Sequence, residues 1–95
     1  MKVVFDPDFH KLYKKVDVRI QNSVDERIRI FRKNHLDLQL NNHSLKEPYL
    51  GCHSIDITAD FRAIYKEQQT GKETVAYFFI LGTHEELYSP EQNES

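Results

Sequence analysis

The first third of the chain carries apolar side chains at steps of three or four residues, which is the spacing of an amphipathic helix. The stripe consists of Phe9, Leu12, Tyr13, Val16, Ile20, Val24, Ile28 and Phe31. Asp17 interrupts the run and is a residue type that favours helix starts. The pattern therefore predicts a helical hairpin over residues 8–15 and 18–34.

A different period begins after residue 51, where apolar and polar residues alternate as in a half-buried strand. Residues 53–58 form the first predicted strand and residues 61–66 the second. The segment 68–72 is rich in polar residues and glycine, and predicts a loose hairpin loop. Residues 74–81 would be apolar on both faces of a strand, which indicates a central strand covered on both sides.

Residues 2–5 are a short strand candidate, and Asp6-Pro7 is typical of a helix start. The predicted order is therefore one strand, two helices and a meander of three antiparallel strands. This order indicates an α+β fold, a small sheet with helices on one face. We expect one domain over residues 1–88, and an acidic tail over residues 89–95 that is disordered.

Composition narrows the class of protein. Of the 95 residues, 39% are hydrophobic and 29% charged, which suits one soluble domain. No apolar stretch reaches membrane-spanning length, and Cys52 is the single cysteine, so a reducing cytoplasm is the expected location. Eight lysines and arginines but three acidic residues lie between His10 and His35. This basic region suits a polyanion or an acidic protein, or is simply a solvated helix face.

The most informative short segment follows the predicted central strand. Thr83 and Glu86 have the spacing of a capping box, which predicts a short helix after Gly82. Gly82 would let the strand turn at that point. The helix then carries His84 and Tyr88 at its surface. On this pattern alone, His84 is either an incidental first-turn residue or part of a site.

Other polar residues favour a site. Asp56 points away from the predicted core, and Arg62 and Asp60 come from the adjoining strand and turn, while His43 lies in the preceding loop. If they meet His84 on one concave face, they can cleave RNA by its own 2′-hydroxyl. One group removes a proton, another protonates the leaving oxygen, and a cation stabilises the phosphorane.

Each member of this set has an ordinary structural explanation as well. The carboxylate of Asp60 suits a turn, His43 can cap a loop, and Arg62 can pair with Asp56 on an exposed sheet face. None of the histidines has the spacing of a zinc ligand set. We therefore expect neither a metal nor a cofactor.

Two segments resemble a known family. "LNNHSLKEPYLGCHSIDITADFRAIYKE" (40–67) and "VAYFFILGTHEELY" (75–88) are similar to the RelE/ParE superfamily of bacterial toxins, and within it to the YafQ-like mRNA interferases. The resemblance implies a RelE-like fold and a ribosome-dependent endoribonuclease, the toxin of a type II toxin–antitoxin system. Such an enzyme cuts mRNA in the ribosomal A site, beside ribosomal RNA.

The resemblance also implies roles for individual residues. It assigns His84 and Asp60 to the proton transfers, with His43 assisting one of them, and Arg62 to stabilising the phosphate charge.

Four further positions are assigned to substrate binding. Phe61 and Tyr88 would hold bases, and Lys46 and Asp56 complete the substrate-binding set. The YafQ-like branch has a histidine at the position of Asp56, so this chain lacks one imidazole. His53, three residues earlier, is expected to face the other side of the sheet.

The expected partner is a cognate antitoxin, and operator DNA would be bound only through that antitoxin. Two alternatives stay open. One is a ParE-like inhibitor of DNA gyrase on the same scaffold, and the other a catalytically degenerate homologue that acts as a binding or regulatory subunit.

Overall fold

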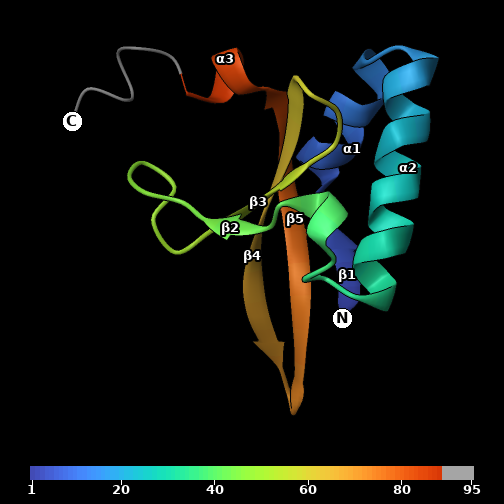
Figure 1. Cartoon of the computed structure of the whole chain (residues 1–95). Helices are drawn as coiled ribbons and strands as arrows, with labels where there is room; N and C mark the ends of the chain where they lie inside the picture. Colours follow the sequence, from blue (N-terminus) through green and yellow to red (C-terminus); the bar gives the residue numbers. More distant parts are fainter. Residues whose placement is uncertain (89–95) are drawn as a thin grey trace.

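A mixed sheet forms the centre of the computed structural model, which describes residues 1–88 (Figure 1). In this part of the chain the strand order is β1-β5-β4-β3-β2. The strands are β1 (Lys2–Phe5), β2 (His43–Ser44), β3 (His53–Asp56), β4 (Phe61–Thr70) and β5 (Glu73–Thr83). β1 runs parallel to β5, and the other neighbours are antiparallel. The predicted α+β meander is confirmed, with β2 as an additional edge strand. The tail expected over residues 89–95 lies outside the described residues.

Helices α1 (Pro7–Lys15) and α2 (Val18–Lys33) lie together on one side of the sheet (Figure 1). Each begins at an aspartate whose carboxylate accepts a main-chain hydrogen bond: Asp6 from Asp8 N at 2.7 Å, and Asp17 from Ile20 N at 3.0 Å. Such caps satisfy amides that the first helical turn leaves unpaired. The predicted hairpin is confirmed to within a residue. No helix within residues 1–88 is long and apolar enough to cross a membrane.

The main core lies between the helices and the sheet, and the apolar stripe of the sequence supplies its helical half. Its buried members are Phe9, Val24, Ile28, Phe31, Leu40, Ile55, Ile57, Ala63, Tyr65, Ala76, Phe78 and Leu81. The ring of Phe31 is fully buried and contacts Phe78 at 5.2 Å and Tyr65 at 5.0 Å between centroids. Leu40 comes from η1 (Leu38–Leu40), the turn that links α2 to β2.

The β4–β5 hairpin is longer than the sequence predicted. β4 continues to Thr70 and β5 starts at Glu73, so Gly71 and Lys72 alone form the connection. The expected loop over residues 68–72 is therefore wrong. The polar residues of this segment are exposed on a two-stranded ribbon. Main-chain hydrogen bonds hold such a ribbon together, so the polarity of its side chains does not reveal the strands.

β5 is apolar on both faces, as predicted, because an apolar cluster lies on each side of it, and a β-bulge decides which residues face each cluster. Ile64 pairs with Ile80 but Tyr65 pairs with Phe78, so Phe79 is an extra residue. Phe78 and Leu81 belong to the helix-side core, whereas Phe79 and Ile80 belong to a second apolar cluster. That cluster contains Leu45, Ile64 and Leu87, with Tyr49, Cys52, Phe79, Ile80 and Tyr88 packed against it. This second cluster packs on the sheet face opposite the helices.

Candidate active site

A cleft of about 500 Å³ opens on the sheet face that the helices do not cover. It lies between β2 with its following loop, the strands β3 and β4, and the short helix α3 (His84–Leu87). Five of the residues assigned from the sequence line it: His43, Lys46, Arg62, His84 and Tyr88. The structure thus brings together two imidazoles, a guanidinium, an ammonium and a phenol.

Helix α3 places His84 at the cleft. Thr83 Oγ1 accepts a hydrogen bond from Glu86 N at 3.1 Å, and the Glu86 carboxylate accepts one from Thr83 N at 2.8 Å. The predicted capping box is confirmed. His84 N also donates to the Asp60 carbonyl at 2.8 Å, which ties the first turn of α3 to the β3–β4 turn.

Gly82 has a different purpose from the one predicted. It lies inside β5 rather than at a turn. A Cβ at this position would lie 3.1 Å from Glu86 Oε1 and 3.3 Å from Leu87 Cδ2. Leu87 is 7% exposed and anchors α3 on the second apolar cluster. Glycine therefore suits this position, because α3 packs directly on the strand and a Cβ would require Glu86 and Leu87 to shift slightly.

Tyr88 supports the imidazole of His84. Their ring centroids are 4.7 Å apart, and the rings of Tyr49 and Tyr88 form a T-shaped pair with centroids 6.1 Å apart. Burial raises the pKa of the Tyr88 phenol, an effect that a hydrogen bond from Ser54 partly offsets. Tyr88 is thus a neutral phenol at neutral pH, and its ring is already in contact with His84 on one side.

The second imidazole is fixed by the main chain. His43 lies in β2 opposite Ser54, and its Nδ1 is 2.8 Å from the Asn41 carbonyl oxygen. Because a carbonyl can only accept, Nδ1 carries the hydrogen, and neutral His43 presents the lone pair of Nε2. Asn41 adopts a left-handed conformation, φ 49°, which turns its carbonyl toward the ring.

The guanidinium of Arg62 is held by its neighbours. Its Nε is 3.0 Å from Asp56 Oδ1, and Nη1 donates to the carbonyls of Thr58 at 3.0 Å and Ala59 at 3.1 Å. The side chains of Arg62 and Asp56 are 17% and 29% exposed, so solvent screens this ion pair only partly. Nη2 takes part in none of the hydrogen bonds or ion pairs found in residues 1–88, and it is the nitrogen left for a ligand.

Three assigned residues lie elsewhere. Asp56 does not line the cleft. It forms an ion pair with Arg62, which is one of the alternatives that the sequence left open. Asp60 is exposed and contributes its carbonyl, whereas its carboxylate is outside the lining. Phe61 packs against the helix-side core.

The structure also adds two residues that the sequence analysis did not single out. Asn41 orients His43, and Tyr49 supports Tyr88. The repeated asparagines at positions 41 and 42 are a turn signal that points to the first of them. His53 stacks on Tyr65 at 5.2 Å between centroids, on the helix side as expected. Within residues 1–88, no three His, Cys, Asp or Glu side chains gather as a metal site would require.

No protein family model and no curated protein sequence matches this chain. Solved structures do match. YafQ from E. coli strain BL21(DE3) superposes with a TM-score of 0.71 at 23% identity, over 92% of this chain and 97% of YafQ. A YoeB/ParE toxin from Agrobacterium tumefaciens gives 0.70 at 23%, over 88% and 99%.

The chain has the fold of the RelE/ParE toxins. The RelBE2 toxin–antitoxin complex from Mycobacterium tuberculosis gives a TM-score of 0.62 at 19% identity, over 87% of this chain and 96% of the matched one. The resemblance noted in the sequence is confirmed at the level of the fold. What the RelE/ParE fold does in this chain depends on the residues of the cleft.

Proposed function

We propose that the protein is the toxin of a type II toxin–antitoxin system and cleaves mRNA as a ribosome-dependent endoribonuclease. The observation that carries the proposal is the meeting of His43, His84 and Arg62 in one cleft. A structure named as a YoeB/ParE toxin and one named as the DinJ–YafQ toxin–antitoxin complex match over nearly the whole of their matched chains, which supports the same hypothesis. The cytoplasm, where ribosomes are, is the corresponding location.

The cleft residues suit cleavage by the 2′-hydroxyl of the RNA. Nε2 of His43 removes the 2′-hydroxyl proton while the 2′-oxygen attacks the adjacent phosphorus. The bond from phosphorus to the 5′-oxygen then breaks, and His84, which acts in its protonated form, gives that oxygen its proton. The products are a 2′,3′-cyclic phosphate and a free 5′-hydroxyl, so the proton count balances. A positioned acid or base typically contributes about 10²–10⁴-fold.

In this proposal Arg62 stabilises the charge of the phosphorane through Nη2. Its other nitrogens are held by Asp56 and by the β3–β4 turn, so little reorganisation accompanies the reaction. Lys46, exposed at the cleft, adds a cation for the phosphate backbone of mRNA or ribosomal RNA.

Two assignments change from those that the resemblance implied. The proposal gives His43, in place of Asp60, the second proton transfer, because the Asp60 carboxylate is outside the cleft lining. Tyr88 is proposed to position the imidazole of His84 instead of holding a base. Phe61 is proposed to contact no base, because it packs against the helix-side core.

An antitoxin is the partner that the proposal requires. Similar structures include the E. coli DinJ–YafQ toxin–antitoxin complex and the RelBE2 complex, which supports a protein of that kind as partner. Operator DNA would then be bound through the antitoxin.

The decisive experiment is cleavage of a translated mRNA in a reconstituted translation system, mapped by primer extension. Wild type is expected to cut at codon-spaced positions only when ribosomes are present. His84→Ala and His43→Ala are each expected to lose about 10²-fold or more of this activity. His10→Ala is the matched control, because His10 is an exposed imidazole on α1, outside the cleft.

Other outcomes would overturn the proposal. Folded wild-type protein that leaves mRNA intact but blocks gyrase supercoiling would be a ParE-like inhibitor. Folded protein that does neither would be a degenerate homologue with a binding role. Full cleavage by His84→Ala would refute the mechanism.

A further inference from the structure

We propose that Asn42 is a positioning residue, whose side-chain amide holds His43 in the geometry that proton transfer requires. Because His43 is the base of the proposed ribonuclease, this role rests on the proposed function. Asn42 is half-buried, between the exposed residues Asn41 and His43. Its side chain reaches the helix side of the sheet, where it contacts Tyr65, whereas His43 lines the cleft on the other side.

His43 has little support from its own strand. β2 consists of His43 and Ser44, which pair with Ser54 and His53 of β3. Within residues 1–88, β2 is the last strand of the sheet and has β3 as its single neighbour. Short edge strands are marginal by themselves and open locally at low cost. A base that must stay within about 0.5 Å of its working geometry therefore needs a further support.

Asn42 supplies this support with both hydrogens of its amide. Its Nδ2 donates to the main-chain oxygen of His35 at 2.9 Å and to the hydroxyl oxygen of Tyr65 at 2.8 Å. Because a main-chain carbonyl can only accept, Nδ2 and not Oδ1 must face His35, which fixes the orientation of the amide. The two bonds connect the start of β2 to segments that lie 7 and 23 residues away in sequence.

The first of these acceptors, Tyr65, lies in the helix-side core. It is 1% exposed, and its ring centroid is 5.0 Å from those of Phe31 and Phe78. Burial raises the pKa of the Tyr65 phenol, and the hydrogen bond from Asn42 partly offsets this effect. The phenol is therefore neutral at neutral pH, and its oxygen is held in place by the packing of the ring.

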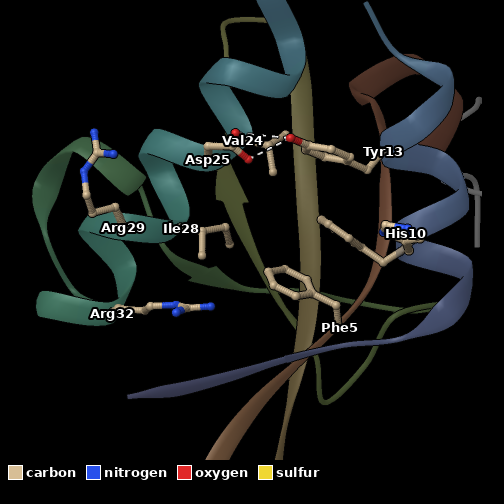
Figure 2. A pocket seen from close by; sticks show the side chains of 9 residues that line it. Phe5, His10, Tyr13, Val24, Asp25, Ile28, Arg29 and Arg32 are labelled. Atoms are coloured by element: carbon tan, nitrogen blue, oxygen red, sulfur yellow. Dashed lines mark hydrogen bonds between the residues drawn. The ribbon is translucent and has the colours of Figure 1, made fainter. Parts of the chain in front are cut away.

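The second acceptor belongs to the helix layer. His35 follows the end of α2, and its ring centroid is 5.9 Å from that of Phe31. α2 is in turn tied to α1, because the Tyr13 hydroxyl donates to the Asp25 carboxylate at 2.9 and 3.1 Å (Figure 2). The chain then passes through η1 to β2 at the edge of the sheet (Figure 1). The start of β2 is thus bonded to a helix layer that is itself fixed.

The consequence for the cleft concerns the tautomer of His43. Its Nδ1 hydrogen is directed at the Asn41 carbonyl, 2.8 Å away, which leaves Nε2 as the basic nitrogen. Asn41 is exposed and directly precedes Asn42, so the bonds of the Asn42 amide also fix the place of that carbonyl. When the carbonyl moves away, both tautomers become accessible, and the form with its hydrogen on Nε2 cannot accept a proton there.

The first test measures this tautomer in protein without RNA. Nitrogen NMR of isotope-labelled histidine, at a mildly alkaline pH where imidazoles are neutral, shows which ring nitrogen carries the hydrogen. The signals of His43 are identified by their absence from His43→Ala. Asn42→Ala is expected to lower the ratio of the Nδ1–H to the Nε2–H form by about fivefold, the effect of losing roughly 1 kcal/mol of hydrogen bonding.

The second test is cleavage of mRNA in the reconstituted translation system. For Asn42→Ala, kcat is expected to fall about tenfold, because a misplaced base loses part of the rate that a positioned one supplies. KM is expected to stay within about twofold of wild type, because Arg62, which meets the phosphate, is held by Asp56 and by the β3–β4 turn.

Two further variants complete the design. Tyr65→Phe removes one of the two acceptors and keeps the buried ring, so its tautomer ratio is expected between those of wild type and Asn42→Ala. It carries the test if circular dichroism shows that Asn42→Ala does not fold. Asn22→Ala is the matched control, because it removes an exposed amide of α2 outside the cleft, and it is expected to match wild type in both tests.

Two results would overturn the role of Asn42. One is a wild-type tautomer ratio of His43 in folded Asn42→Ala, whatever its kcat. The other is a changed ratio with an unchanged kcat. The tautomer is measured without ribosomes or mRNA, so a wild type that lacks ribonuclease activity refutes the proposed function, whereas an unchanged tautomer ratio refutes the role of Asn42.

Discussion

Removing the Thr83 hydroxyl is expected to loosen α3 while the sheet stays folded. In Thr83→Ala the hydrogen bond from Glu86 N, 3.1 Å long, is lost, and half of the capping box with it. Replacing a Ser or Thr cap by Ala costs about 1 kcal/mol. The cost does not rise further, because Glu86 is exposed and its free amide can bond to water.

About 1 kcal/mol corresponds to roughly a fivefold change in an equilibrium ratio. Since α3 has only four residues, this change acts on the equilibrium between formed and frayed helix. The bond from His84 N to the Asp60 carbonyl and the buried Leu87 remain in place. Local opening is therefore expected to rise about fivefold, while the free energy of global unfolding falls by no more than about 1 kcal/mol.

Amide hydrogen exchange of Tyr88, followed by NMR, measures the local opening directly, because Tyr88 N donates to the His84 carbonyl at 2.9 Å inside α3. Exchange is expected to be about five times faster in Thr83→Ala than in wild type. Thr83→Ser keeps the hydroxyl and is expected to exchange at the wild-type rate. Equal exchange rates for wild type and Thr83→Ala would refute the reasoning that the capping box stabilises α3, the helix that carries His84.

Three further predictions concern the core, the strand under α3 and the acid stability. Phe31→Ala removes a fully buried ring and is expected to cost about 3–5 kcal/mol in urea unfolding. Gly82→Ala places a Cβ 3.3 Å from Leu87 Cδ2 and is expected to cost about 1 kcal/mol, lowering Tm by roughly 4–8 °C. The Tyr77 hydroxyl donates to Asp6 and holds the pKa of that carboxyl below its usual 3.8. Wild type should therefore exceed Tyr77→Phe in unfolding free energy at neutral pH, and the difference should vanish as pH falls through the lowered pKa of Asp6.

The local sequence determined those parts of the fold whose partners lie within a few residues. Asp6 and Asp17 cap the helices through amides two and three positions away, and Thr83 and Glu86 cap each other. The apolar period separated helices from strands for the same reason, since side-chain direction repeats every 3.6 or 2 residues. The helical hairpin, the meander and the short capped helix that carries His84 were therefore predictable from the sequence alone.

Tertiary structure decided which of the polar residues act together. The bulge at Phe79 shifts the register of β4 against β5, and a shift of one residue moves side chains to the opposite face. Loop geometry likewise fixed the Nδ1 hydrogen of His43 through a carbonyl, and the Asp60 carboxylate is not among the groups that line the cleft. The resemblance indicated which residue types gather near His84, but their hydrogen-bond partners did not follow from it. These partners come from segments far apart in sequence, so their geometry depends on strand pairing and loop packing, which no local pattern of residues encodes.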